Sequence, residues 1–65
     1  MTIIVNGKAR TVTSTDLAGI LEELGYSGAR VATAHGGEFV PASHRAACRL
    51  RDGDRVEILA PMQGG

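Results

Sequence analysis

Residues 2–12 read TIIVNGKARTV, and this stretch decides the fold. Two runs rich in strand-forming residues, TIIV and KARTV, are separated by Asn6 and Gly7. Both of these residues tolerate a positive φ, which the two central positions of a type I′ turn require. The segment therefore predicts a β-hairpin whose two strands pair antiparallel.

An amphipathic helix is predicted after this hairpin. Its apolar residues recur at i, i+3, i+4 and i+7 and so share one face: Leu17, Ile20, Leu21 and Leu24. Ser14, Thr15 and Asp16 come just before them, and their side chains can accept from the free amides of a helix start. Gly25 is placed to end the helix in a left-handed cap.

Three further strands are predicted in the second half of the chain. RVATA (30–34) and EFVP (38–41) flank a turn at His35, while RVEILA (55–60) follows the turn Asp52-Gly53-Asp54. Residues 42–47 between them can make a helical turn.

The arrangement of these elements follows from their apolar patterns. The first and last strands alternate most strongly, which favours a central parallel pair, and the helix between them permits that connection. A helix with one apolar face packs on one face of a sheet. We therefore predict an α+β fold over residues 1–60, in which a small mixed sheet packs on one helix.

Strand alternation also predicts an apolar patch on the outer face of the sheet. Successive strand residues point to opposite faces, so Ile4 and Leu59 face outward while Val56 and Ile58 face the helix. Ile4 and Leu59 lie on neighbouring strands, and Met62 can extend the patch. Contiguous exposed apolar surface favours a docking role, although single apolar side chains on a surface are ordinary.

The last residues, PMQGG (61–65), are predicted to form a flexible C-terminal tail. Pro61 has no amide to continue a strand ladder, so pairing should stop there. Five extended residues reach about 17 Å, enough to place Gly65 inside a partner while the domain docks outside. Gly64 and Gly65 have no side chains, so the tail is narrow and the carbon of its terminal carboxylate is open to attack. Taken alone, two glycines are also typical of a frayed terminus.

Composition narrows the classes of function. The chain has 65 residues, which leaves too little mass to wall in a catalytic cleft, so we expect no enzyme. Seven basic and seven acidic residues give no net positive charge, which argues against nucleic acid. With no apolar run long enough for a bilayer, no signal segment and one cysteine, a cytoplasmic protein that binds no membrane is expected.

The remaining reactive side chains carry weaker signals. Cys48 is most simply a small apolar filler, and a role in sulfur relay would need an electropositive setting that Arg45 and Arg49 could supply. The run from Arg45 to Arg55 is interpreted as a solvated, partly self-paired surface, with a docking patch for an acidic partner as the alternative.

Neither the histidines nor the turn carboxylates predict a site. His35 and His44 lack partners at metal-ligand spacing, so no metal is expected. Asp52 and Asp54 flank a glycine, and their carboxylates are expected to bond to local amides in a turn.

Five motifs together resemble the ThiS family, the sulfur carrier proteins of thiamine biosynthesis with the ubiquitin-like β-grasp fold. They are VNG (5–7), the apolar stripe over 17–24, GEFVP (37–41), DGDRVEI (52–58) and APMQGG (60–65). The resemblance covers the whole chain, and the conjunction of turn and tail motifs is specific where Gly-Gly alone is not.

The resemblance implies a carrier cycle at Gly65. A ThiF-type adenylyltransferase uses ATP and magnesium to form the acyl adenylate, and sulfur from cysteine, supplied through a desulfurase, replaces AMP to give a thiocarboxylate. A ThiG-type thiazole synthase then takes the sulfur. The chain itself would bind no cofactor and be a monomer when free. Gly64 would let the tail enter partner sites, and the implied docking residues are Ile4, Leu59, Pro61, Met62 and Gln63.

Two other readings of the same tail remain open. A carrier resembling the small subunit of molybdopterin synthase shares the fold and tail but is usually longer. A ubiquitin-like modifier or interaction module would have Gly65 joined to a lysine or chemically idle, and isopeptide adducts would favour it.

Overall fold

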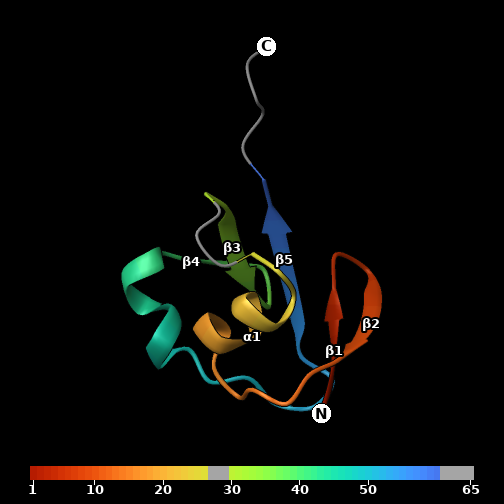
Figure 1. The fold of residues 1–65 in the computed structure, drawn as a ribbon. Helices are drawn as coiled ribbons and strands as arrows, with labels where there is room; N and C mark the ends of the chain where they lie inside the picture. The colour runs from red at the N-terminus through yellow and green to blue at the C-terminus, as the bar shows by residue number, and fades with distance from the viewer. Residues whose placement is uncertain (27–29, 61–65) are drawn as a thin grey trace.

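The computed structural model describes residues 1–26 and 30–60, and this part of the chain forms one sheet covered on one face by helices (Figure 1). The elements in chain order are β1 (Thr2–Val5), β2 (Lys8–Thr11), α1 (Leu17–Glu23), β3 (Ala32–His35), β4 (Glu38–Val40), the 3₁₀ helix η1 (Ala42–Ala47) and β5 (Arg55–Leu59).

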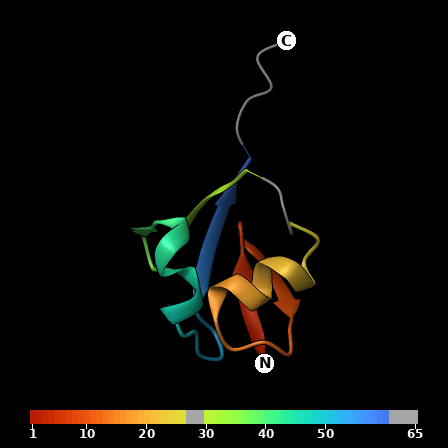
Figure 2. The same ribbon diagram turned by 60° about the vertical axis from the view of Figure 1, so that its left-hand side comes forward.

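The sheet has the strand order β2-β1-β5-β3-β4 among the described residues. β1 and β5 pair in parallel, with Ile4 opposite Arg55 and Val5 opposite Val56, whereas the other neighbours are antiparallel. The predicted central parallel pair is therefore confirmed. Because β5 runs away from the N terminus, its last residue lies at the opposite end of the domain from Met1 (Figures 1 and 2).

The predicted turn and helix ends are also confirmed. Asn6 and Gly7 have φ angles of 50° and 83°, the two positive values that a type I′ turn needs. Asp16 caps α1, its carboxylate accepting from the amide of Gly19 at 2.8 Å. At the other end Gly25 has a φ of 90°, a backbone conformation that glycine adopts without a side-chain clash.

An aliphatic core lies between the sheet and α1. Its buried members are Ile3, Val5, Val12, Leu17, Ile20, Leu21, Leu50, Val56 and Ile58. The helical stripe contributes three of these residues, and β1 and β5 contribute four. Figure 2 shows α1 and η1 side by side, with the sheet behind them. The core thus fixes which face of β5 is hidden.

The boundaries differ slightly from those predicted. β3 is Ala32–His35 and not 30–34, while β4 ends one residue before Pro41, whose missing amide cannot continue the ladder. The helical turn over 42–47 is a 3₁₀ helix. The predicted tail 61–65 lies outside the described residues, as do residues 27–29. Within the described ranges, no helix is long and apolar enough to cross a bilayer.

Candidate functional site

The candidate site is the outer end of β5, up to Ala60. Of the residues that the sequence predicted to act, Ile4 and Leu59 fall within the described part of the chain. The others lie outside it: Pro61, Met62, Gln63, Gly64 and Gly65. The geometry at the base of the tail can therefore be built from β1, β5 and their neighbours.

β5 separates two kinds of side chain with the predicted alternation. Val56 is fully buried and Ile58 is 3% exposed, whereas Leu59 is 66% exposed. On the neighbouring strand Ile4 is half-buried, between the buried Ile3 and Val5. Leu59 thus presents an apolar side chain to solvent directly before the tail.

Asn6 holds the end of β5 in place. Its side-chain nitrogen donates to the carbonyl of Ile58 at 2.9 Å, and its side-chain oxygen accepts from the amide of Ile58 at 2.8 Å. Both backbone groups of Ile58 are therefore bonded to one side-chain amide, which replaces a β1 residue after that strand has ended at Val5. The sequence assigned Asn6 to the turn only, and nothing in a local pattern shows a partner 52 residues away.

A shallow hollow connects the two outward apolar residues. It has a volume of about 330 Å³ and lies over β1 and β5, and the charged side chains of Arg55 and Glu57 line it together with Ile4, Asn6, Gly7 and Leu59. The structure therefore brings Ile4 and Leu59 to one concave surface, which Asn6 also borders.

A second hollow, of about 580 Å³, lies on the other side of Leu59. Its wall includes Arg30, Val31, Arg45 and Ala60, so it combines apolar surface with two cationic side chains at the base of the tail.

The hydrogen bonds of Arg45 differ from those expected from the sequence. Its Nε donates to Thr33 Oγ1 at 3.1 Å and its Nη2 donates to the Val31 carbonyl at 2.6 Å. The interpretation of a solvated, partly self-paired surface does not hold for Arg45, because its side chain is bonded to Thr33 of β3 and to Val31, the residue before that strand. Its charge borders the second hollow instead.

The carboxylates of Asp52 and Asp54 bond to residues outside their own turn, which the sequence did not predict. Asp54 does bond locally, accepting from the Arg51 amide at 2.9 Å, but it also pairs with His35 at 2.9 Å. Asp52 accepts from the amide of Thr2, at the start of β1. Over residues 1–26 and 30–60, no three His, Cys, Asp or Glu side chains gather in a way that could hold a metal ion.

Cys48 is the small apolar filler that the sequence favoured, since it is partly buried and packs against the aliphatic core. Burial, and then the negative charge of Asp54, raise the pKa of its thiol. The electropositive environment considered from the sequence is therefore wrong, since Arg45 is bonded to β3. The nearest polar partner of the thiol is His35, with Sγ 3.6 Å from Nδ1.

A mixed sheet grasping one α-helix, with an outward apolar residue at the end of the central strand, defines a β-grasp protein of the ubiquitin-like type. The model of the ThiS family matches residues 3–65, and the chain belongs to this family of small sulfur carrier proteins, which are not enzymes.

Two relatives show how far the similarity extends. The chain is similar to the crystal structure of the thiamine biosynthesis protein ThiS from Geobacter metallireducens, with a TM-score of 0.83 and 33% identity, covering 100% of both chains. It is 36% identical to a thiazole synthase of Paramagnetospirillum magneticum (strain ATCC 700264 / AMB-1) over 100% of its own residues. The chain spans only 20% of that protein's length.

Proposed function

We propose that the carboxylate of Gly65 carries the sulfur atom destined for the thiazole ring of thiamine. The family match carries this proposal, because it extends through Gly64 and Gly65 and so includes the residues that would react. The proposal requires that Gly65 be the end of the mature chain, a point that an intact mass checks directly.

Chemistry at this carboxylate needs activation by a partner. A carboxylate is ionised at neutral pH and is a poor electrophile. In the proposed cycle a ThiF-type adenylyltransferase, using ATP and magnesium, joins the carboxylate to AMP and releases pyrophosphate. A persulfide formed by a cysteine desulfurase then attacks the adenylate and displaces AMP, which gives an acyl disulfide on Gly65. A thiol reductant cleaves its sulfur–sulfur bond, forming a disulfide with the donor's thiol and leaving the thiocarboxylate.

The surface before the tail supports docking to such partners. Ile4 and Leu59 border one hollow, and Asn6 fixes the strand that carries Leu59, so the apolar surface is presented in one geometry. Arg30 and Arg45 border the hollow on the other side of Leu59 and would complement acidic groups on a partner. Pro61, Met62 and Gln63 would extend this contact along the tail.

Thiazole synthase is the proposed acceptor of the sulfur. The relative from P. magneticum bears that name and contains a segment similar to the whole of this chain. A carrier-like segment within a thiazole synthase supports a direct transfer between the two proteins. In this proposal the free carrier is a cytoplasmic monomer that moves between its partners.

Reconstitution tests the activation step. The chain is incubated with a ThiF-type adenylyltransferase, ATP and magnesium, and pyrophosphate release and intact mass are followed. We expect a mass increase of one adenylyl group on the full chain, followed by replacement of one carboxylate oxygen by sulfur when cysteine and a desulfurase are added. Absence of adenylate on the full chain, or its attachment at another residue, would overturn the proposal.

Two exposed residues make a matched test of the docking surface. Leu59 is 66% exposed at the end of β5 and Phe39 is 70% exposed on the edge strand β4. Leu59→Asp should raise the KM for the carrier in adenylation by about tenfold or more, since a carboxylate buried in an apolar contact without a partner is costly. Phe39→Asp should change it by less than about twofold. Equal effects would contradict docking through β1 and β5.

A further inference from the structure

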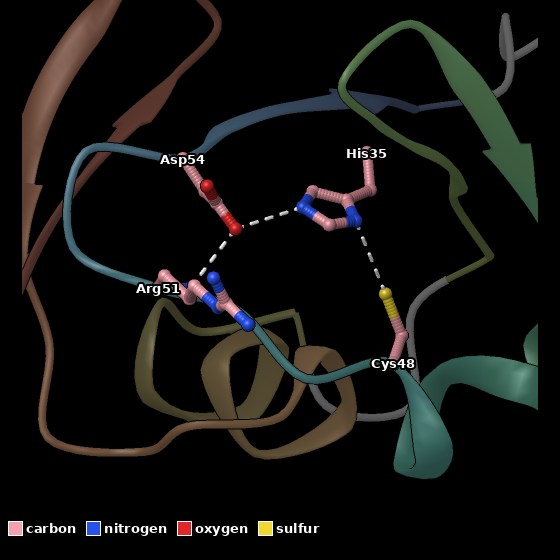
Figure 3. A network of polar contacts seen from close by, with 4 residues as sticks. All are labelled: His35, Cys48, Arg51 and Asp54. Carbon is pink, nitrogen blue, oxygen red and sulfur yellow. Dashed lines mark hydrogen bonds and ion pairs between the residues drawn. The ribbon is translucent and has the colours of Figure 1, made fainter.

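Three side chains that the carrier cycle does not use form a connected network on the helical side of the domain (Figure 3). Cys48 Sγ lies 3.6 Å from His35 Nδ1, and His35 Nε2 lies 2.9 Å from Asp54 Oδ2. The same carboxylate oxygen accepts from the Arg51 amide at 2.9 Å. Residues from the end of β3, the end of η1 and the turn before β5 thus meet at one place.

The hydrogen bonds determine which ring nitrogen can accept a proton. Bonds from the Arg51 amide and then from His35 lower the pKa of Asp54, so its carboxylate is ionised and can only accept. In the neutral form of the His35 ring, an Nε2–H that donates to this carboxylate leaves the lone pair of Nδ1 facing the thiol of Cys48. The order is thiol, imidazole, carboxylate, the same as in nucleophiles activated by an adjacent base.

Cys48 is partly buried, and it lines an open hollow of about 350 Å³ together with His35. Val40, Pro41 and Ala47 give this hollow an apolar wall. The hollow is large enough for a small molecule to lie beside Cys48.

We propose that Cys48, His35 and Asp54 form a thiol-exchange site at which Cys48 attacks the sulfur–sulfur bond of a small disulfide or persulfide. As the new bond to Cys48 Sγ forms, the thiol proton passes to His35 Nδ1 and the sulfur–sulfur bond of the reagent breaks. The leaving thiolate takes the proton back from His35. A disulfide leaves a mixed disulfide on Cys48 and one free thiol, and a persulfide leaves Cys48 persulfide and one free thiol.

The base is essential to this step. Because burial and Asp54 raise the pKa of Cys48, the resting side chain is the protonated thiol, which is a weak nucleophile. His35 supplies the acceptor for its proton, and Asp54 is a positioning residue that holds the ring. The site requires neither Gly65 nor adenylation, so a result that overturns the carrier cycle does not overturn this proposal, and the reverse also holds.

The test measures modification of the full chain by two small probes, 2-hydroxyethyl disulfide and cysteine persulfide. Intact mass and peptide mapping follow the hydroxyethylthio adduct or the gain of one sulfur atom on Cys48. The rate for each variant is divided by its rate in denaturant, where the thiol has lost its neighbours. Adducts on Cys48 in the folded protein are expected. The probe that reacts faster shows whether the site prefers a disulfide or a persulfide. A folded chain that reacts with neither probe would overturn the proposal.

Substitutions separate base chemistry from packing. His35→Gln keeps a donor for Asp54 but cannot take a proton, and it should slow the normalised rate about tenfold or more. Asp54→Asn keeps an oxygen that can accept from the Arg51 amide, so the turn is preserved, and it should also slow the reaction. Asp52→Asn is the matched control, because Asp52 bonds to Thr2 and not to His35. Its rate should stay at that of the unmodified chain.

A spectroscopic readout tests the positioning role of Asp54. Nitrogen chemical shifts of His35 should report the tautomer protonated at Nε2 in the unmodified chain and a shifted tautomer population in Asp54→Asn. If the tautomer is unchanged in Asp54→Asn, or if His35→Gln reacts as fast as the unmodified chain, the proposed site is wrong.

Discussion

The two faces of β5 differ in how deeply their side chains are buried. Val56 and Ile58 point inward and are 0% and 3% exposed, while Leu59, the next residue, is 66% exposed. The inward residues are fixed by an aliphatic core that α1 completes, whereas the outward residue contributes little to that core. A single five-residue strand therefore carries the fold on one face and the candidate docking surface on the other, which predicts that stability and function can be changed independently.

The largest loss of stability is expected when a buried residue on the inner face of β5 is truncated. Ile58→Ala should lower the free energy of unfolding by about 2–4 kcal/mol, because it removes buried methyl groups and leaves a cavity. Leu59→Ala, one residue away, should change it by less than about 0.5 kcal/mol. Urea denaturation of the two variants makes the comparison. Similar losses for both would show that the outer face is also structural.

The second largest loss of stability is expected at Asn6, whose side chain bonds to Ile58 of β5. Asn6→Gly keeps a residue that tolerates the positive φ but removes both bonds to Ile58, so it should cost about 1–2 kcal/mol. Asn6→Ala should cost about 1 kcal/mol more, since alanine is strained at that φ. If Asn6→Gly unfolds at the same denaturant concentration as the unmodified chain, then Asn6 does not hold β5.

A third prediction concerns an exposed residue that does have a structural partner. Glu23, at the end of α1, accepts from the amides of Ser14 and Thr13, with the shortest bond at 2.6 Å. These bonds, that from Ser14 first, lower the pKa of Glu23 from 4.5 to about 2. The folded state favours the ionised carboxylate, so this contribution is complete above about pH 4.5 and is lost as the pH falls toward 2.

The measurement is thermal unfolding between pH 7 and pH 2. Glu23→Gln should flatten the part of the curve between pH 4.5 and pH 2, because the amide has no such proton to gain. Glu22→Gln, at the exposed neighbouring position, controls for the loss of one carboxylate. An acid limb that is unchanged in Glu23→Gln would mean that its bonds to the loop do not contribute in solution.

The smallest effect on stability is expected at the tail. Deleting Gly65 should leave the unfolding temperature nearly unchanged, because termini are tolerant of truncation where their backbone is not bonded to the domain. The same deletion should abolish adenylation, since the reacting carboxylate then belongs to another residue. A large loss of thermal stability on deletion would show that residues 61–65 are part of the fold.

Much of the fold could be predicted because its signals are local. The Asn6-Gly7 turn, the cap at Asp16 and the stripe over residues 17–24 each depend on neighbours within one element. The outward position of Ile4 and Leu59 followed from strand alternation, a periodicity of two that tertiary packing did not alter.

The missed features depend on contacts between distant elements. Asn6 meets Ile58, Arg45 meets Val31 and His35 meets Cys48 only once the sheet order is set. No periodicity records such pairs, because a polar residue in a turn has the same local sequence whether its side chain bonds to solvent or to another strand. The alternative of an electropositive setting for Cys48 failed for this reason, since charge counted along the chain does not show where each side chain points.

Intact-protein mass spectrometry of the chain purified from its native host under reducing conditions tests whether Gly65 carries sulfur. We expect a fraction in which one oxygen of the terminal carboxylate is replaced by sulfur, with fragment ions that place the change on Gly65. A chain that stays unmodified there, even after incubation with an activating enzyme, ATP and a sulfur source, would contradict the proposed role of Gly65. Isopeptide adducts through Gly65 would contradict it in favour of a protein modifier.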